Sequence, residues 1–584
     1  MKKILLLVLF FSFGFTPQIY SQQKNFTKYW IVFKDKGEFK PTTVIKLGSK
    51  AYNVGLSLLT ERAVNRRLKV LPENKLIDYM DLPVNQKYIN EIKSEKVQII
   101  AVSRWLNGVS AYLTAEQVEE ILDLDYVMGL RVVDKLIKQS VESQQAELET
   151  ELQKKDSIKY KYDYGRSLKQ MEMVNVPLLH QMGFTGKGVM IASFDDGFDW
   201  RNHESLQDLN ITMEYDFINE DSATYMQKNQ KYEDKNNQGS HGTATLSTMS
   251  GFKNGKLVSP AFGSEIILAK TEYVPTETPM EEDFWLEAAE WAEALGVDII
   301  TSSLIYRNYD DAYSNNTYLY KHLNGDAPIT SFAGDRCTYL GVAVFQAMGN
   351  YDQTTEPSLG SAADGDSVIS VGAVMYNGKP ANFTSNGPTG DGQMKPDVSA
   401  PGVFVYFATM KEKSGDNISY EYGDGTSFST PITAGVAALL LEANPSLTPM
   451  QLREALRMTA NQSDKPDNVL GWGVVNAYNA ALYSGIIWSP YPEIQTNTNG
   501  INISTYIASN TKLDESSIKV FYNTDGASNY DEAPLTLSTE VFDANGSGRY
   551  TASIPSSSGF TEFNYYFYAK DITGKESFFY PKKD

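Results

Sequence analysis

The sequence predicts an α/β fold, in which a mostly parallel sheet with helices on both faces is preceded by a small α/β domain and followed by an all-β sandwich. Three observations lead to this prediction. Strand-like apolar runs alternate with helical patterns from Gly186 to Ser484, which is typical of a parallel sheet covered on both sides. A shorter α/β pattern fills residues 24–134. After Gly485, short strands are separated by turns of Asn, Asp, Gly and Ser.

The composition of the 584 residues indicates a folded protein with several domains. The net charge of −20 argues against nucleic acid or an anionic membrane surface as the main partner, so we expect no nucleic-acid partner. The single cysteine, Cys337, cannot form an intramolecular disulfide. We expect it to be a small buried hydrophobic residue.

Residues 1–21 have the pattern of an export signal. Lys2 and Lys3 form a positive start, residues 4–15 form an apolar run, and Ser21 offers a small residue for cleavage. The apolar run is shorter than the roughly 20 residues of a membrane-spanning helix, and no later run is long enough. We therefore expect a secreted, periplasmic or cell-surface protein without a membrane span.

Residues 22–135 are predicted to form the small α/β domain. Its strands are expected at residues 29–33, 97–101, 108–113 and 127–133. Thr114-Ala-Glu-Gln117 matches a capping box that opens a helix over residues 118–124. Residues 136–165 are rich in Gln, Glu, Ser and Lys, and are predicted to be a solvated helix or a flexible linker where processing occurs.

Residues 166–484 are predicted to form the parallel-sheet domain. Its strands are expected at residues 189–194, 265–269, 297–301 and 341–347, and its helices at residues 239–251, 281–295 and 329–340. A polar insertion is expected over residues 306–324. Active groups in such sheets gather at the carboxyl ends of strands. Asp195, Ser303 and Asn350 each follow a strand, so we expect them to share one edge of the sheet.

The stretch from Gly423 to Leu441 is the centre of this domain. A glycine-rich turn brings Ser427 to the start of an apolar helix with many small residues, which predicts a central buried helix. A serine at this place is also a good N-cap, and Pro431 fits the first turn of a helix. Ser427 is therefore a helix cap or a nucleophile, and the rest of the chain decides between them.

A serine nucleophile needs a base, and the base needs an orienting acid. The chain has four histidines, of which His241 is the best candidate because it opens a helix beside small residues. Asp195 is the best candidate acid, since it ends a strand. No histidine follows Ser427, as an α/β-hydrolase would require, and the histidine does not precede the acid, as in chymotrypsin. The order Asp195, His241, Ser427 is the subtilisin order.

The motifs around these residues resemble the signature blocks of the subtilisin-like serine peptidases. The blocks are I-A-S-F-D-D-G-F-D (191–199), H-G-T-A-T-L-S-T-M-S-G (241–251), M-G-N (348–350) and G-T-S-F-S-T-P (425–431), supported by K-P-D-V-S-A-P-G (395–402) and G-W-G-V-V-N-A (471–477). The resemblance spans about residues 168–484. More weakly, the N-terminal domain resembles the propeptide that folds such enzymes and inhibits them until it is removed.

The resemblance implies a serine endopeptidase that is made as a zymogen and processes itself in the linker. Ser427 would be the nucleophile, His241 the base and Asp195 the orienting acid. Asn350 would donate a hydrogen bond to the oxyanion beside the Ser427 N–H group. Proteins or peptides would be cleaved through an acyl-enzyme, the chain's own propeptide would be an intramolecular inhibitor, and no cofactor is required.

The same resemblance implies where substrate binds. The substrate would add as a β-strand along residues 302–304, a backbone mode that tolerates many sequences. Met348 lies near the expected oxyanion site and either lines the primary pocket or fills the core. The predicted substrate-binding residues are Ser302, Ser303, Leu304, Met348 and Gly349.

Several positions depart from the family pattern. Ala244 stands where the family often has a second histidine, and Ile305 stands where it often has glycine. A β-branched side chain at position 305 is expected to narrow the cleft. Residues 429–432 also differ from the usual A-T-P-histidine pattern. A second hypothesis therefore stays open, in which the chain is a binding or adhesion protein on a subtilisin-like scaffold that has lost turnover, with the C-terminal domain as its working part.

No D-x-D-x-D-G loop appears, so calcium, which this family often binds, stays open and no metal site is assigned. The acidic segments 281–283 and 364–366 are expected to be solvated loops or helix starts. Residues 485–584 are predicted to form the β-sandwich, with a hairpin turn over residues 571–574. Its strands are expected at residues 518–522, 550–554 and 564–569, and the aromatic residues Tyr565, Phe567, Phe578 and Phe579 are expected in its core and sheet face.

Overall fold

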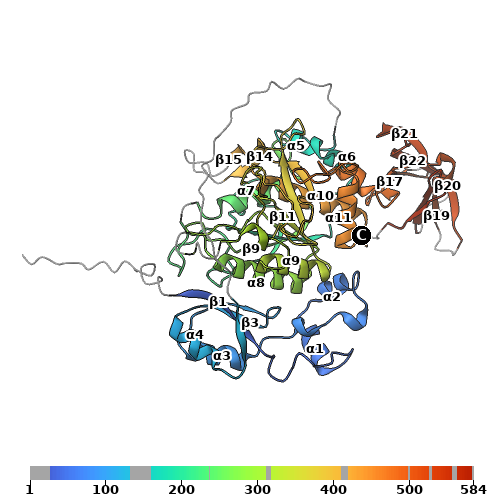
Figure 1. Ribbon diagram of the computed structural model, residues 1–584. Coiled ribbons are helices and arrows are strands. Elements are labelled where there is room, and N and C mark those ends of the chain that lie inside the picture. The colour runs from blue at the N-terminus through green and yellow to red at the C-terminus, as the bar shows by residue number, and fades with distance from the viewer. Residues whose placement is uncertain are drawn as a thin grey trace, which may run out of the picture.

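The computed structural model describes residues 26–131, 160–235, 237–310, 313, 317–409, 419–497, 500–524, 529–555 and 562–581. Three units follow one another along the chain: an N-terminal domain (blue in Figure 1), a large α/β domain (cyan to orange) and a C-terminal β-domain (red). The predicted export signal and most of the predicted linker lie outside the described residues.

The N-terminal domain is a four-stranded antiparallel sheet with order β2-β3-β1-β4. Its elements are β1 (Thr27–Phe33), α1 (Lys50–Leu56), α2 (Glu61–Arg67), η2 (Glu73–Lys75), η3 (Tyr79–Asp81), α3 (Gln86–Ser94), β2 (Ile99–Ser103), β3 (Gly108–Leu113), α4 (Ala115–Leu122) and β4 (Val127–Arg131). The predicted capping box of Thr114 and Gln117 opens α4. Alternate residues of β1 point to opposite sides, so that Ile31 packs into the domain's own core and Trp30 packs against the large domain.

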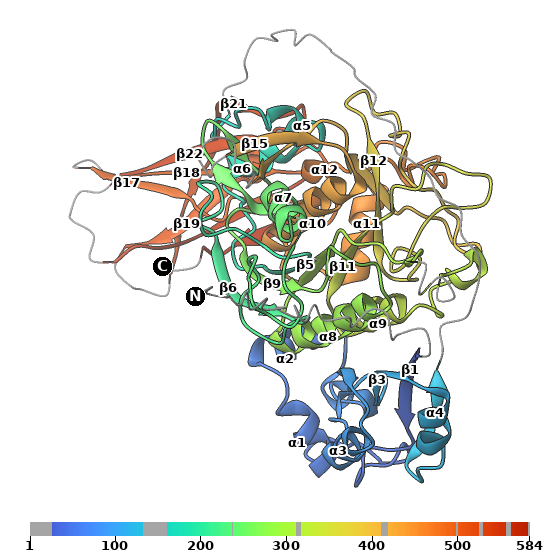
Figure 2. The same ribbon diagram turned by 90° about the vertical axis from the view of Figure 1, so that its left-hand side faces the viewer.

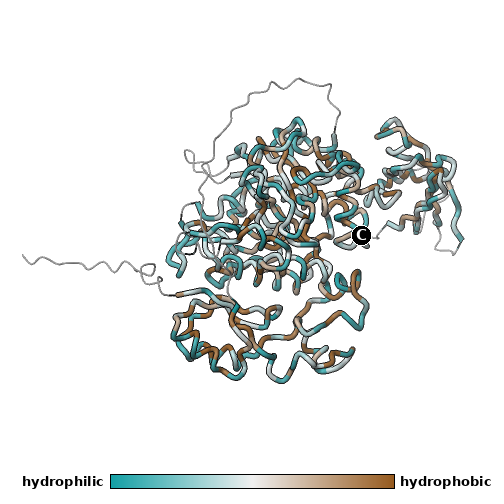
Figure 3. Tube along the Cα trace, in the orientation of Figure 1, coloured by the Kyte–Doolittle hydropathy of each residue, from teal (hydrophilic) through white to brown (hydrophobic). Residues whose placement is uncertain are grey.

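The large domain is built on a seven-stranded sheet with order β13-β12-β11-β10-β5-β9-β6, in which every neighbouring pair is parallel. The strands are β5 (Met190–Asp195), β6 (Asn210–Asp216), β9 (Glu265–Lys270), β10 (Ile299–Ser302), β11 (Ala343–Ala347), β12 (Ile369–Val374) and β13 (Val398–Pro401). This confirms the predicted parallel sheet. The strand side chains alternate between two hydrophobic cores, one on each face, and hydrophobic stretches (brown in Figure 3) run through the interior.

Helices cover both faces of this sheet, as predicted (Figure 2). One core contains α5 (Leu168–Met173), α6 (Val176–Met182), α7 (Ser240–Ser250), α10 (Thr426–Ala443), α11 (Pro449–Met458) and α12 (Ala477–Ala481). The other contains α8 (Met280–Leu295) and α9 (Ile329–Tyr339), with Cys337 buried in α9. Shorter elements are β7 (Phe252–Lys253), β8 (Leu257–Val258), η5 (Tyr320–His322), β14 (Val405–Thr409) and β15 (Ser419–Gly423).

Two predictions about polar segments hold only in part. Residues 281–283 open α8, as expected for a helix start, but they are buried instead of solvated. Residues 306–324 are not simply a polar insertion, because Tyr309 and Tyr318 are buried and both donate their hydroxyl groups to the Glu282 carboxylate. Asp364 is also buried, with its carboxylate accepting from the Ser331 hydroxyl and the Gly325 N–H group.

The N-terminal domain packs against α8 (Figures 1 and 2). Three of its side chains donate to the buried Asp283 carboxylate: Lys28 at 2.8 Å, Trp30 at 2.9 Å, and Ser110. Further along α8, Arg67 binds both carboxylate oxygens of Glu293 at 2.8 Å. The partners that bury these acids therefore come from a part of the chain more than 170 residues away.

The C-terminal domain is a β-sandwich of two antiparallel sheets around one core. One sheet contains β16 (Ile487–Trp488), β17 (Glu493–Asn497), β18 (Gly500–Ala508), β21 (Thr536–Val541) and β22 (Gly548–Pro555), and the other contains β19 (Lys519–Asn523), β20 (Asp531–Pro534), β23 (Asn564–Lys570) and β24 (Glu576–Phe579), with η6 (Glu515–Ser517) between β18 and β19 in the chain. The predicted hairpin turn joins β23 to β24, and Asp571 accepts from the N–H groups of Thr573 and Lys575. Phe567 is buried in the core, whereas Phe578 is exposed on the outer face. Across the three described units, no helix is long and apolar enough to cross a bilayer.

Candidate active site

The predicted catalytic groups lie at the carboxyl edge of the parallel sheet. Asp195 ends β5 and Ser303 directly follows β10. These two strands are paired with Phe194 opposite Ser302, so the next residue of each strand, Asp195 and Ser303, also lie side by side. The other two groups come from helix starts that face this edge, His241 from α7 and Ser427 from α10.

Three donors hold the buried carboxylate of Asp195. His241 Nδ1 lies 2.6 Å from Oδ1, and the Asp196 N–H group donates to the same oxygen at 2.8 Å. The hydroxyl of Thr245 lies 2.9 Å from Oδ2 and 3.1 Å from the Gly242 carbonyl oxygen. Sequence reasoning missed Thr245, although its spacing of four residues from His241 places both side chains on one face of α7.

Asp196 holds the start of α7 against the sheet. Its carboxylate accepts from the N–H groups of Gly242 at 2.8 Å and of His241 at 3.4 Å, which have no partners inside the helix. A Cβ atom at position 242 would lie 2.1 Å from the Gly197 carbonyl oxygen and 2.9 Å from Asp195 Cβ. Glycine is therefore required at 242 for the helix to bring His241 to Asp195.

The electrostatics of the pair favour a charged imidazole. Burial lowers the pKa of His241, but the charge and hydrogen bond of Asp195, together with the charge of Asp196, outweigh burial and raise this pKa to about 9. Burial and the charge of Asp195 raise the pKa of Asp196 to about 7. The His241 side chain is 39% exposed, so a reacting group can reach it from solvent. A base with this environment holds a proton well once it has taken one.

Ser427 is not a helix cap. The residue before α10 is Gly425, whose φ of +153° favours glycine, and Ser427 is the second residue of the helix. Its hydroxyl lies 3.5 Å from the Ser303 carbonyl oxygen. Since Asp195 and Ser303 are neighbours across β5 and β10, the Asp195–His241 pair and Ser427 lie at one edge. Among the described residues, the Ser427 hydroxyl makes no hydrogen bond to His241, a contact that often forms only when substrate binds.

The prediction that Pro431 lies in the first helical turn is wrong. The helix begins at Thr426, so Pro431 is its sixth residue and lies inside it. In an α-helix the N–H group of residue 431 would bond the carbonyl of Ser427, but proline has no N–H group. The Ser303 hydroxyl donates to that carbonyl instead, at 2.9 Å.

Asn350 lies beside the turn that leads into Ser427, with a fixed orientation. Its Oδ1 atom accepts from the N–H group of Thr426 at 3.0 Å and from the Thr426 hydroxyl at 2.9 Å. Its Nδ2 atom lies 3.6 Å from the place where a Cβ atom on Gly425 would be. Because both contacts to Thr426 use the amide oxygen, the amide nitrogen stays available as a donor next to Ser427. Sequence reasoning singled out Asn350 but not Thr426.

The predicted substrate-binding residues differ in their surroundings. Ser302 is buried and its hydroxyl accepts from Trp285 Nε1 at 3.0 Å, and the carbonyl of Leu304 accepts from a buried glutamine side chain. Met348 is fully buried in the core under α8 and α9, which favours its interpretation as a core residue. Gly349 follows with a φ of +107°, a conformation that suits glycine. Their roles toward substrate stay predictions.

The two family departures have simple structural settings. Ala244 is buried in the core of the large domain. Ile305 is partly buried and packs against Gly360, where a Cβ atom would lie 2.4 Å from Ile305 Cγ2. The absence of a side chain at position 360 therefore makes room for the isoleucine. Neither departure replaces a group that binds Asp195 or His241.

Among the residues that the structure describes, two groups of side chains have the composition of a metal site. The first is Asp195, Asp196 and His241, where the direct 2.6 Å hydrogen bond between His241 and Asp195 is the contact expected of a base and its orienting acid. The second is a cluster of three glutamates at the end of β9.

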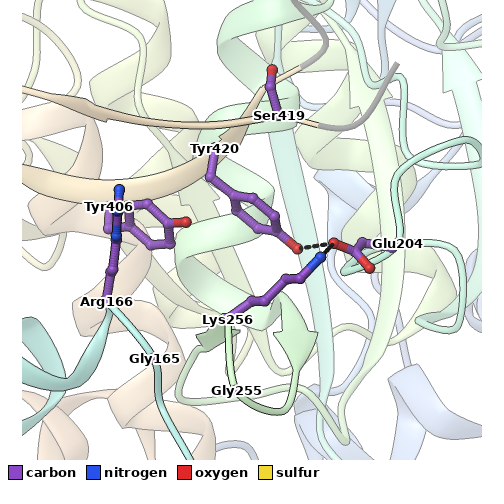
Figure 4. A pocket seen from close by; sticks show the side chains of 8 residues that line it. All are labelled: Gly165, Arg166, Glu204, Gly255, Lys256, Tyr406, Ser419 and Tyr420. Atoms are coloured by element: carbon purple, nitrogen blue, oxygen red, sulfur yellow. Dashed lines mark hydrogen bonds and ion pairs between the residues drawn. The ribbon is translucent and has the colours of Figure 1, made fainter. Parts of the chain in front are cut away.

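A surface pocket lies between β14, β15 and residues 165–166 (Figure 4). Its charged groups are partly paired, because Glu204 forms an ion pair with Lys256 and accepts from the Tyr420 hydroxyl at 3.1 Å. None of the predicted catalytic or substrate-binding residues lines it.

Two family models match the chain. The peptidase S8 propeptide domain of Bacteroidota matches residues 28–150, and the Subtilase family, Peptidase S8, matches residues 186–473. The chain belongs to the subtilase family. It is a serine-type endopeptidase by family and carries an S8 propeptide domain in front of its subtilase domain.

Similar proteins agree with this assignment. Serine protease AprX of Bacillus subtilis (strain 168) is 29% identical over 319 residues, covering 51% of this chain and 66% of AprX. Subtilisin E of the same organism is 28% identical over 342 residues, covering 57% of this chain and 77% of that protein. Bacillopeptidase F, also from that organism, is 25% identical over 491 residues, covering 79% of this chain and 31% of its own length.

A solved structure shares the fold of this subtilase. Fervidolysin from Fervidobacterium pennivorans, described as a keratinolytic enzyme related to subtilisin, superimposes with a TM-score of 0.52 at 19% sequence identity. The superposition covers 93% of this chain and 70% of fervidolysin. This likeness confirms the subtilisin fold, while the exact domain boundaries predicted above stay predictions.

Proposed function

We propose that this subtilase is a secreted serine endopeptidase that cleaves peptide bonds through an acyl-enzyme on Ser427 and is made as a zymogen that trims itself in the linker. One observation carries the proposal. His241 Nδ1 lies 2.6 Å from Asp195 at the sheet edge where the buried helix α10 presents Ser427. A base that is oriented by an acid and lies near a serine whose hydroxyl does not cap the helix is the arrangement that nucleophilic acyl transfer requires.

In the proposed reaction, Ser427 Oγ attacks the carbonyl carbon of the scissile peptide bond while His241 takes the hydroxyl proton. Asp195 stabilises the resulting imidazolium. The oxyanion that forms accepts from the Ser427 N–H group and the Asn350 side chain. Collapse of this intermediate expels the amine, which receives the proton from His241. A water molecule, deprotonated by His241, then attacks the acyl-enzyme and releases the new carboxylate and Ser427.

The interface with the N-terminal domain supports the zymogen part of the proposal. The buried contacts of Lys28 with Asp283 and of Arg67 with Glu293 tie the propeptide domain to α8, one helix of the subtilase domain. Both ion pairs are almost completely buried, so removing the partner of either acid would leave an unpaired buried charge at a large cost in free energy. The domain would therefore remain docked on the subtilase domain until the linker is cut.

A fluorophosphonate probe tests the enzyme assignment. The processed wild-type protein should be labelled, whereas Ser427→Ala should not. Ser429→Ala is a matched control, since Ser429 lies in the same helix and its buried hydroxyl donates only to backbone carbonyls, the nearer at 3.0 Å. Failure of the processed wild type to label would favour the alternative, a binding or adhesion protein on this scaffold, for which Ala244 and Ile305 are the motivating departures.

Expression of the Ser427→Ala protein alone tests self-processing. It should stay full-length, whereas the wild type should lose residues up to about position 166. Loss of the same segment from the inactive variant would show that another protease makes the cut. Detection of the shortened wild type outside the cytoplasm would support export.

A further inference from the structure

Three glutamates meet beside the catalytic edge. A carboxylate oxygen of each of Glu272, Glu277 and Glu281 lies within 4.8 Å of the other two. Glu272 follows the end of β9, Glu277 lies in the loop after it, and Glu281 is in the first turn of α8. Exposure falls from Glu277, which is exposed, through Glu272 to Glu281, which is 1% exposed. The cluster therefore opens to solvent on one side and ends at a buried carboxylate.

The buried member of the cluster lacks a partner. Glu281 Oε2 accepts from the Thr278 N–H group at 2.6 Å, but the buried Oε1 atom has no hydrogen-bond partner in the described parts of the chain. Its neighbours on α8 are equally buried but have hydrogen-bond donors, because Glu282 accepts from two tyrosine hydroxyls and Asp283 forms an ion pair with Lys28. Leaving a buried carboxylate oxygen without a donor is costly, so the contrast indicates a ligand at Glu281.

No positive side chain offsets the charge of this cluster. Within the described ranges, none of the three glutamates forms an ion pair with lysine or arginine. A fourth carboxylate borders the cluster, since Asp310 Oδ2 accepts from the Glu277 N–H group at 3.2 Å. Burial and the charge of Asp310 raise the pKa of Glu277 to about 7. Burial and the charges of Glu272 and Glu277 raise the pKa of Glu281 well above its usual value.

We propose that Glu272, Glu277 and Glu281 bind a Ca²⁺ ion. Carboxylate oxygens are the ligands that Ca²⁺ prefers, at about 2.3–2.6 Å, so two oxygens on one ion are at most about 5 Å apart. The observed limit of 4.8 Å meets this condition. Mg²⁺ dehydrates reluctantly and is usually held by one or two carboxylates together with several waters, so a site of three carboxylates suits it less well. The ion joins the end of β9 to the start of α8, and its binding does not depend on the proposed peptidase mechanism.

Binding is measured on the full-length Ser427→Ala protein after removal of metal with EGTA, by calorimetric titration with CaCl₂. Glu281→Gln in the same background should bind one Ca²⁺ fewer per chain. Glu282→Gln is the matched control, since it is equally buried one residue away but contacts Tyr309 and Tyr318, and it should bind as the parent does. Equal stoichiometry and affinity in the parent and the Glu281→Gln protein would overturn the proposal.

Thermal unfolding gives a second readout that a purely structural role of Glu281 would not produce. In EGTA, Glu281→Gln should melt at or above the temperature of the parent, because it removes like-charge repulsion. In millimolar Ca²⁺ the order should reverse, since only the parent gains from the ion. Glu277→Gln, at the exposed rim, should behave in the same way if Glu281→Gln does not fold. An equal Ca²⁺ shift in all proteins places the ion elsewhere and refutes the site, and an equal shift with Mg²⁺ refutes the assignment to calcium.

Discussion

The contact between Ser303 and the backbone of Ser427 allows a sharp test of how Ser427, the proposed nucleophile, is held. Pro431 removes the helical N–H group that would bond the Ser427 carbonyl, and the Ser303 hydroxyl replaces it at 2.9 Å. Ser303→Ala should leave this carbonyl without a donor. Pro431→Ala should restore the missing N–H group one turn along the helix, so the two substitutions should compensate each other.

The size of the effect follows from the hydrogen bond. Leaving a buried acceptor unpaired costs about 1–3 kcal/mol, and the partial exposure of Ser427 places this contact at the lower end. A loss of about 1–1.5 kcal/mol in the transition state corresponds to a fall of about 5- to 12-fold in kcat/KM. In the Pro431→Ala background the same Ser303→Ala change should cost less than about twofold, a coupling of about 1 kcal/mol between the two sites.

The assay is kcat/KM for a chromogenic peptide with all four proteins of the cycle, each corrected by active-site titration with the fluorophosphonate probe. The titration separates a misplaced nucleophile from misfolded protein. Equal losses for Ser303→Ala with and without Pro431 would show that the hydroxyl does not act through the Ser427 carbonyl, and the argument would fail.

Four further predictions concern other contacts. Thr245→Val should lower kcat/KM by about tenfold or more, because it removes a donor from the charged Asp195, while Thr245→Ser should retain activity. The raised pKa of His241, about 9, means that the neutral base is scarce below that pH, so kcat/KM should rise with pH up to about 9 and a plateau from pH 6 would contradict this. Lys270→Met should lower the free energy of unfolding by about 3–5 kcal/mol in denaturant titrations, because it leaves the buried carboxylates of Asp216 and Asp234, now 2.9 and 2.7 Å from the lysine nitrogen, without a partner. An unchanged midpoint would refute the pairing of Lys270 with these two acids. Glu287 accepts from the Val102 N–H group of the propeptide domain, and burial raises the pKa of Glu287 to about 8. Docking of the propeptide domain should therefore be strongest below the ordinary pKa of a glutamate and should weaken as the pH rises through 8. On gel filtration the cleaved propeptide should be released faster at pH 9 than at pH 6.5, and Glu287→Gln should abolish this difference.

The sequence was sufficient for the fold class and for the sheet edge that carries the site. Alternating strand and helix patterns predict the parallel sheet, and the ends of β5, β10 and β11 then place Asp195, Ser303 and Asn350 together without any coordinates. Predictions that depend on one short segment were also confirmed, namely the capping box at Thr114 and the hairpin turn at Asp571.

Contacts between distant segments could not be predicted in this way. The acids at the start of α8 have a solvated pattern in the sequence. The burial of Asp283 depends on the docked N-terminal domain, whose Lys28 lies 255 residues away in the chain, and the burial of Glu282 depends on Tyr309 and Tyr318. Thr245 and Thr426 act through hydrogen bonds that depend on how α7 and α10 approach the sheet. The prediction for Pro431 failed because the helix already starts at Thr426, directly after the glycine turn, which puts Pro431 beyond the first turn.

The carboxylates of α8 discussed above serve two tasks, according to their position on the helix. Asp283, Glu287 and Glu290 are separated by four and three residues, which places them on one face, and all three accept from the propeptide domain. Glu281 lies off this face and meets the glutamates after β9. Cutting the linker can therefore release the propeptide domain and uncover one row of acids without touching the proposed cation site. The helix start beside the catalytic edge would keep its ion in the mature enzyme, while the opposite face changes from a buried interface to a negatively charged surface.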